Sequence, residues 1–227
     1  WIGYFATALN ETGKAALVMA NSASDAGGSE LEIRKKMIEA GIISQMVTLP
    51  SNMFSTVTLP ATLWFFNRTR PHKDEILFID ARNIFTQVDR AHRKFSDEQI
   101  KNLGIITRLY EGDSEAFWAL VEEYRSNGRQ ADADWLLARW PAGKYHDVVG
   151  LCKVAKIDGE DGIEDNDWSL NAGRYVGVVI EDDGMTEDEF RTEMLSLNSE
   201  LSKLNSEASD LQNEIEMNMK KMFGEKC

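Results

Sequence analysis

The chain has 227 residues, a formal net charge of −13 and 43% hydrophobic residues, which allows one large domain with appendages. The acidic balance excludes a protein whose whole surface binds nucleic acid, because phosphate contacts require local Lys or Arg. Cys152 and Cys227 form neither a disulfide framework nor a zinc spacing, and no apolar run approaches a membrane span, so we expect a cytoplasmic protein without a membrane partner.

Helical and strand patterns alternate in the first part of the chain, which places it in the α/β class and predicts a mostly parallel sheet. Ser29 and Glu32 have the spacing of a capping box at the start of a helix, and Gly41 is a natural stop for that helix. The last two strands are joined by a short loop, so we expect them to be antiparallel. The expected elements are helix 1–9, strand 15–20, loop 21–28, helix 29–40, and strands 42–49 and 58–67.

The middle of the chain changes character and becomes mainly helical. Ser96 and Gln99 form a second capping-box pattern. An amphipathic stretch at residues 113–139 contains a polar break at 126–130, which predicts two helices. The expected elements are a linker at 68–74, strand 75–80, helix 96–103, the helix pair within 113–139, and an acidic loop at 157–167.

A heptad pattern dominates the C-terminal region from Thr186 onward. The apolar positions follow alternating steps of four and three, and Asn218 breaks the register. This pattern predicts a long helix with a narrow apolar stripe, which must be covered by a helix of this chain or of another. The alternative is a helix packed flat on its own domain. The stripe consists of Phe190, Met194, Leu197, Leu201, Leu204, Ala208, Leu211, Ile215 and Met222.

Several features that resemble ligand sites are incomplete. Gly27 and Gly28 precede a helix but lack a full glycine fingerprint for phosphate binding. The acidic run 158–167 lacks the glycine and the terminal glutamate of a calcium loop. The three histidines are far apart in the sequence and show no ligand spacing, so we predict no metal site. No nucleophile, histidine and carboxylate arrangement is recognisable either.

The stretch 48–68 contains an aromatic residue in an unusual position. Phe54 lies in a polar loop between two apolar, β-prone runs. Such a residue can pack against the strands that flank it, or it can be the side chain that a rigid sheet edge presents to a ligand. The residues alone leave both interpretations open.

An ordered set of short motifs resembles one family. It comprises Met19-Ala20-Asn21, Glu32-Ile33-Arg34-Lys35, Leu49-Pro50-Ser51-Asn52-Met53-Phe54, Leu59-Pro60-Ala61-Thr62-Leu63-Trp64-Phe65, Phe78-Ile79-Asp80-Ala81-Arg82 and Trp168-Ser169-Leu170-Asn171-Ala172-Gly173-Arg174-Tyr175-Val176. In this order, the set is similar to the modification (M) subunits of type I restriction–modification systems. Members of that family are adenine-specific DNA methyltransferases that use S-adenosylmethionine.

The resemblance implies a fold and a domain organisation. Residues 1–70 would be the C-terminal part of a class I S-adenosylmethionine-dependent methyltransferase domain, with the last three strands of its sheet and their helices. Residues 71–182 would be a family-specific α+β extension that is mainly helical, and 183–227 a coiled-coil-like helical tail. The family's glycine motif for the cofactor and its Asn-Pro-Pro-Phe motif do not occur in this sequence. We therefore expect a C-terminal portion that is inactive alone, does not bind S-adenosylmethionine and carries no catalytic residue.

The resemblance also assigns roles to particular residues. By position, Phe54 would stack on a target adenine flipped out of the duplex, while Asn21, Pro50 and Asn52 would belong to the loops at the ligand edge of the sheet. The heptad stripe would dock on the specificity subunit that selects the DNA target, and a restriction subunit is a further partner. The alternatives are a non-catalytic assembly module that acts through the tail and a nucleotide-binding domain of unrelated function.

Overall fold

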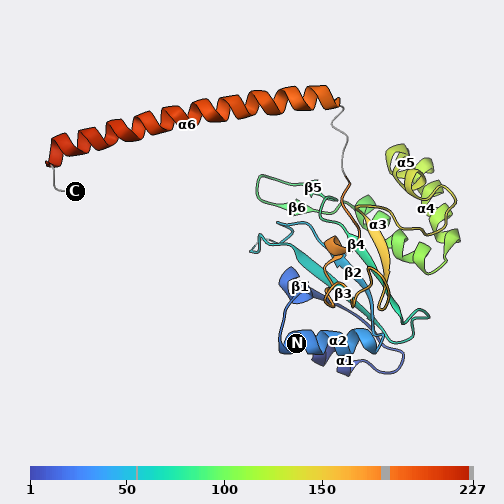
Figure 1. Ribbon diagram of the computed structural model, residues 1–227. Helices are drawn as coiled ribbons and strands as arrows, with labels where there is room; N and C mark the ends of the chain where they lie inside the picture. Colours follow the sequence, from blue (N-terminus) through green and yellow to red (C-terminus); the bar gives the residue numbers. More distant parts are fainter. Residues whose placement is uncertain (55, 180–184, 225–227) are drawn as a thin grey trace. The chain divides into compact units, whose positions relative to one another are not determined.

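The computed structural model describes residues 1–54, 56–179 and 185–224. It contains two compact units, Trp1–Val179 and Ile180–Cys227. The predicted boundary between residues 182 and 183, and Cys227, lie outside the described residues. In the described parts of the chain, no helix is both long enough and apolar enough to cross a membrane. The helices and strands (Figure 1) are α1 Ile2–Ala8, β1 Lys14–Ala20, η1 Asn21–Ser24, α2 Ser29–Glu39, β2 Ile43–Thr48, β3 Ala61–Asn67, β4 Glu75–Asp80, β5 Thr86–Gln87, β6 Arg93–Lys94, α3 Asp97–Tyr110, α4 Ser114–Ser126, α5 Gln130–Arg139, β7 Cys152–Lys156, η2 Ala172–Arg174 and α6 Glu187–Phe223.

A five-stranded mixed sheet with the order β1-β3-β2-β4-β7 organises the first unit. Strand β3 is antiparallel to both β1 and β2, β7 is antiparallel to β4, and only β2 and β4 are parallel. The predicted antiparallel pairing of β2 and β3 is therefore confirmed. The prediction of a mostly parallel sheet is wrong, because the chain returns from β2 to β3 through a direct hairpin connection instead of a helical crossover.

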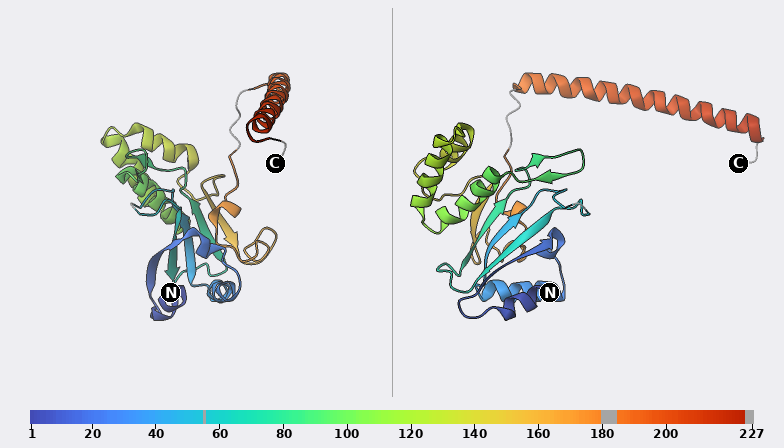
Figure 2. Two further views of the ribbon diagram at one scale, coloured as in Figure 1. Left: turned by 90° about the vertical axis from the view of Figure 1, so that its left-hand side faces the viewer. Right: turned by 180° about the vertical axis from the view of Figure 1, so that it is seen from behind.

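The alternation of side chains along the strands gives the sheet two covered faces. Trp64 and Phe66 of β3 lie in one apolar cluster together with residues of α1 and α2, whereas Leu63 and Phe65 contact the other cluster, which includes residues of α3, α4 and α5. Figures 1 and 2 show these two groups of helices on opposite faces of the sheet. Two separate cores therefore hold the sheet from both sides.

Of the two capping boxes predicted for the first unit, one is confirmed and one is wrong. At α3 the predicted capping box is confirmed, since Ser96 accepts from the Gln99 backbone N–H and the Gln99 side chain accepts from that of Ser96. The box predicted at Ser29 is wrong: Gly28 is the N-cap of α2, no side chain caps that end, and Ser29 already lies in the helix. The predicted break in 113–139 is confirmed by the separate helices α4 and α5.

The structure also differs from the prediction in the length of one helix and in three short strands. Helix α3 extends to Tyr110, beyond the predicted end at 103, and the strands β5, β6 and β7 were not predicted. Residues 68–74 are more than a linker, because the buried Arg70 guanidinium donates to the backbone carbonyls of Gly41, Lys73 and Glu75 at 2.5–2.8 Å. This side chain fixes the β3–β4 connection to the turn between α2 and β2.

Candidate functional site

One edge of the sheet collects the segments singled out in the sequence. Because β1, β2 and β4 run in the same direction, their carboxyl ends lie at the same edge. Asn21 follows β1, Leu49 and Pro50 follow β2, and Ala81 and Arg82 follow β4. In open α/β sheets, ligands bind outside the carboxyl ends of the strands. This edge is therefore the candidate binding edge of the sheet.

The connection between β2 and β3 extends their hairpin beyond the sheet. The backbone N–H of Leu49 donates to the Ala61 carbonyl at 2.8 Å, and that of Asn52 donates to the Thr58 carbonyl at 3.2 Å. Asn52 has a φ of 61°, a left-handed conformation that asparagine tolerates better than most residues. The backbone of this loop is therefore held by specific hydrogen bonds rather than left open.

Phe54 lies on the outer part of this loop and is 41% exposed. It belongs to neither of the two apolar clusters, and its loop neighbours Val57 and Leu59 are also exposed. A side chain that capped the hairpin core would be largely buried in one of those clusters. The aromatic ring is thus exposed to solvent, on a loop positioned by a rigid sheet.

The other residues predicted for this edge have structural bonds of their own. The Asn21 Oδ1 atom accepts from the Thr62 hydroxyl at 2.7 Å, and its backbone N–H donates to the Pro60 carbonyl at 3.4 Å. Pro50 is buried at the end of β2. Asn21 therefore ties the end of β1 to the start of β3, and Asn52 shares the loop with Phe54.

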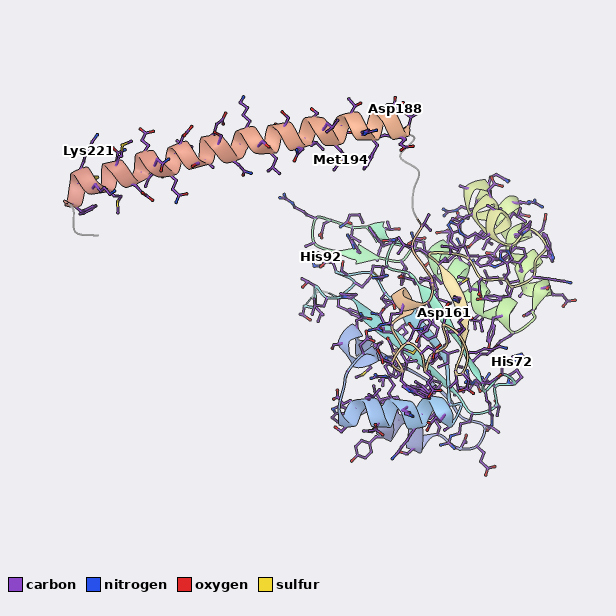
Figure 3. All side chains as sticks on the ribbon, in the orientation of Figure 1. His72, His92, Asp161, Asp188, Met194 and Lys221 are labelled. Carbon is purple, nitrogen blue, oxygen red and sulfur yellow. The ribbon has the colours of Figure 1, made fainter. Side chains whose placement is uncertain are left out.

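The hairpin β5–β6, which was not predicted, is attached directly to this loop. The backbone N–H of Arg93 donates to the Asn52 carbonyl at 2.9 Å, and its Nη1 atom donates to the Ser51 hydroxyl at 3.0 Å. The Arg93 guanidinium also lies 4.0 Å from the centre of the Phe85 ring. The sequence signal for this element was a local cluster of cationic residues in an acidic chain. Figure 3 shows His92 on this hairpin, on the side of the unit where the loop projects.

A buried carboxylate organises the end of β4. Asp80 accepts from Arg82 through Nε at 2.9 Å and through Nη2 at 2.6 Å, a bidentate pair. The hydrogen bond with Asp80 raises the pKa of Arg82, so the guanidinium keeps its charge. A Cβ added at Gly173 would lie 2.9 Å from Arg82 Nη2. Two of the recognised motifs therefore meet here, and the glycine allows close contact.

A second pair of motifs also meets in space. The buried Arg34 donates from Nε to the Trp168 carbonyl at 2.8 Å and from Nη1 to the Ala26 carbonyl at 2.7 Å. Burial lowers the pKa of Arg34. The Lys35 ammonium lies 4.5 Å from the centre of the Trp168 ring. These residues join α2 to the segment around η2, which is a structural role.

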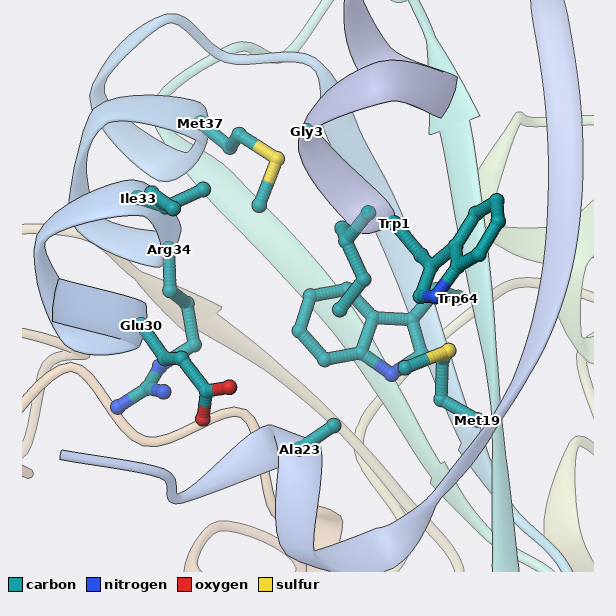
Figure 4. Close-up of a pocket in the computed structure, with 10 residues that line it drawn as sticks. Trp1, Gly3, Met19, Ala23, Glu30, Ile33, Arg34, Met37 and Trp64 are labelled. Atoms are coloured by element: carbon teal, nitrogen blue, oxygen red, sulfur yellow. The ribbon is translucent and has the colours of Figure 1, made fainter.

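A pocket of about 200 Å³ lies on the face of the sheet that α1 and α2 cover. Figure 4 shows the Trp64 indole at its centre, between the start of α1 and Met19. The Trp64 Nε1 N–H is buried and has no hydrogen-bond partner among the described residues. The lining is mainly apolar, and we assign it no ligand. Its residues are Trp1, Ile2, Gly3, Met19, Ala23, Glu30, Ile33, Arg34, Met37 and Trp64.

The helix α6 forms over the predicted heptad region and buries none of its described residues. It starts at a capping box in which Thr186 accepts from the Glu189 backbone N–H and Glu189 accepts from that of Thr186. The predicted contact residues are between 51% and 62% exposed. They are Phe190, Met194, Leu197, Leu201, Leu204, Leu211 and Ile215.

Residues 1–183 match the N-6 DNA methylase family. The match covers the sheet, both layers of helices and the loop with Phe54, and the chain belongs to this family.

Individual relatives of this chain are methylase subunits of type I restriction enzymes. The chain is 34% identical to the type I restriction enzyme MjaIX methylase subunit of Methanocaldococcus jannaschii, over 95% of this chain and 33% of that protein. It is 33% identical to the HindI methylase subunit of Haemophilus influenzae, over 96% of this chain and 42% of that protein. A solved type I methyltransferase subunit from Streptococcus thermophilus superposes with a TM-score of 0.48 and 22% identity, over 74% of this chain and 27% of that chain. The chain thus spans less than half the length of these relatives, and their names do not favour a non-catalytic assembly module.

Proposed function

We propose that this chain forms part of the modification subunit of a type I restriction–modification system, an adenine-specific DNA methyltransferase. In the proposed reaction, the exocyclic amine nitrogen of adenine bonds to the methyl carbon of S-adenosylmethionine while the carbon–sulfur bond breaks. The bonding pair goes to sulfur, and the amine loses a proton. Membership of the N-6 DNA methylase family and similarity to type I methylase subunits support this proposal.

The contribution of this chain to the reaction is to hold the target base. Inside a duplex, the adenine amine is out of reach of an enzyme pocket, so the base must be rotated out of the stack. Stacking of a base on an aromatic ring contributes about 1–3 kcal/mol, which offsets much of the cost of unstacking. The exposed Phe54 ring, on a hydrogen-bonded loop at the carboxyl edge of the sheet, is the observation that carries this proposal.

The glycine pair that precedes α2 does not support a phosphate-binding site for a cofactor. A Cβ added at Gly27 or Gly28 would meet no atom within 4 Å, so these glycines do not form a close-fitting cradle. In our proposal, this chain supplies no cofactor-binding residue and no catalytic acid or base. In our proposal, residues elsewhere in the whole protein bind S-adenosylmethionine.

Assembly is the second contribution that we propose. The exposed stripe on α6 would pack against helices of the specificity subunit, which selects the DNA target. A restriction subunit of the same system is a further proposed partner. The heptad spacing and the lack of burial along α6 support this assignment.

Phe54→Ala in the full-length subunit, assembled with its partners, tests the stacking role. Loss of about 1–3 kcal/mol of stacking corresponds to a fall in kcat/KM for methylation of about 5- to 150-fold. Transfer of a radioactive methyl group to duplex DNA measures this rate. Phe54→Trp keeps a stacking surface and should retain most of the activity, while Val57→Ala removes another exposed apolar side chain of the same loop and serves as the control.

Two results would contradict the stacking role. One is a Phe54→Ala variant that methylates DNA as fast as the parent protein. The other is a loss of activity that follows a fall in the melting temperature, since this would indicate a packing role instead.

A further inference from the structure

We infer that the β5–β6 hairpin contacts the phosphate backbone of duplex DNA beside the flipped base. This inference rests on the proposed methyltransferase function and adds a second DNA-contacting element to it. The hairpin pairs Thr86 with Lys94 and Gln87 with Arg93. Figures 1 and 2 both show it alongside the loop that connects β2 and β3.

The charge of this segment is opposite to that of the chain. Residues 82–94 contain four basic side chains and one acidic side chain, a local net charge of +3 in a chain of net charge −13. Phosphate binding depends on such local groups of Lys and Arg and not on the total charge of the protein. The basic residues are Arg82, Arg90, Arg93 and Lys94.

Some of these basic side chains already form hydrogen bonds with other groups of the protein. Arg82 pairs with Asp80, and Arg93 donates to Ser51. The acidic Asp89 is held within the hairpin, where it accepts from two backbone N–H groups and from the imidazole of His92. These hydrogen bonds lower the pKa of Asp89, with the bond from the Ala91 backbone as the largest cause.

Two cations remain available to an external anion. Arg90 and Lys94 are exposed. Within the described parts of the chain, neither has a hydrogen-bond or ion-pair partner. Exposed cations without a partner on a two-stranded hairpin can approach a phosphate group without breaking any bond of the fold.

The position of the hairpin favours DNA over other acidic partners. The bonds from Arg93 to Asn52 and Ser51 attach it within three residues of Phe54. A base rotated out of the stack stays linked to its own sugar and phosphates. An aromatic ring for the base and cations for the adjoining phosphates are therefore placed together. An acidic peptide has no flipped base, so its binding would not require the aromatic ring beside the cations.

The test is the salt dependence of DNA binding by the full-length subunit assembled with its partners. Each phosphate contact contributes about 0.9 to the slope of log K against log salt concentration, so Arg90→Gln/Lys94→Gln should lower that slope by about 2. Between about 50 and 200 mM salt, the parent should lose about 12-fold more affinity than the variant. Arg125→Gln/Lys144→Gln is the matched control, with the same change in charge at exposed residues of α4 and of the segment after α5.

The possible results separate the inference from the function on which it rests. An unchanged slope in Arg90→Gln/Lys94→Gln, or an equal change in the control, overturns the hairpin assignment while methylation by the parent still supports the proposed function. If the parent neither binds nor methylates DNA, the proposed function fails first. Arg90→Lys/Lys94→Arg keeps both charges and should keep the slope; a loss of slope here would also overturn the assignment.

Discussion

The unit Trp1–Val179 and the helix α6 use apolar side chains in opposite ways. In the first unit, large residues are completely buried on both faces of the sheet, such as Trp64 in one apolar cluster and Trp140 in the other. In α6 the apolar stripe is exposed along the whole described length. Both regions contain helices that begin with the same capping chemistry, at Ser96 and at Thr186. Local sequence signals therefore specify helices in both regions. Among the described residues, however, only the first unit forms a buried core.

The largest expected effect is the loss of a core aromatic residue in the first unit. Phe78 of β4 is buried and stacks on Tyr175 with ring centres 4.0 Å apart. Phe78→Ala should lower the free energy of unfolding of this unit by about 3–5 kcal/mol, since it removes apolar contacts and leaves a cavity. Urea unfolding followed by tryptophan fluorescence measures this unit alone, because all 6 Trp residues lie between positions 1 and 168.

Leu201→Ala on α6 is the control for this measurement. It removes an exposed side chain and should leave the fluorescence transition unchanged. A shift as large as that of Phe78→Ala would show that the stripe stabilises the first unit.

The next effect is on assembly and not on folding. Leu201→Asp/Leu204→Asp places two charges in the stripe and should weaken binding to the specificity subunit of the same system at least about 100-fold, because buried unpaired charges oppose helix packing. Co-purification and titration measure the affinity. Ser199→Asp/Ser206→Asp adds the same charge on the other side of α6 and should bind like the parent chain.

Two results would revise the partner of α6. Normal assembly by Leu201→Asp/Leu204→Asp would exclude the stripe as the docking surface. Self-association of the parent chain in light scattering, abolished by the same variant, would instead identify a second copy of this chain as the partner.

The sequence predicted the elements with strong local signals and missed those without them. The heptad stripe and the capping box at Ser96 led to correct helices, because each of these patterns is formed by residues that are only a few positions apart in the sequence. The strand Cys152–Lys156 was missed because it is short and its place in the sheet depends on β4, about seventy residues earlier. Ser29 failed as a cap because Gly28, with a φ of 63°, already makes the entry into α2.

The candidate site could be predicted in part. The motif at residues 49–54 identified the loop, and the structure shows that Phe54 is exposed at the sheet edge. The hairpin bonds from Arg93 to Asn52 and Ser51 could not be inferred, since they join residues about forty positions apart, one through backbone groups and the other through two side chains. The role of Phe54 in base stacking remains a prediction until its variants are tested.

The smallest effect compares the two capping boxes directly. Ser96→Ala removes the side-chain acceptor for the Gln99 N–H of α3, a helix packed in the core, and should lower the free energy of unfolding of the first unit by about 1 kcal/mol. Thr186→Ala removes the equivalent acceptor at α6. Because α6 buries none of its described residues, its first turn should fray with no change in the tryptophan transition.

Circular dichroism and fluorescence together measure the difference. Thr186→Ala should lower the helical signal at 222 nm by the equivalent of about one turn, or about 4 residues, while Ser96→Ala should shift the urea midpoint in both signals. Ser96→Thr and Thr186→Ser keep a capping hydroxyl and should resemble the parent chain. If Thr186→Ala lowered the urea midpoint of the fluorescence as much as Ser96→Ala does, the two regions would unfold together, and α6 could not be treated as a helix that depends on an external partner for its packing.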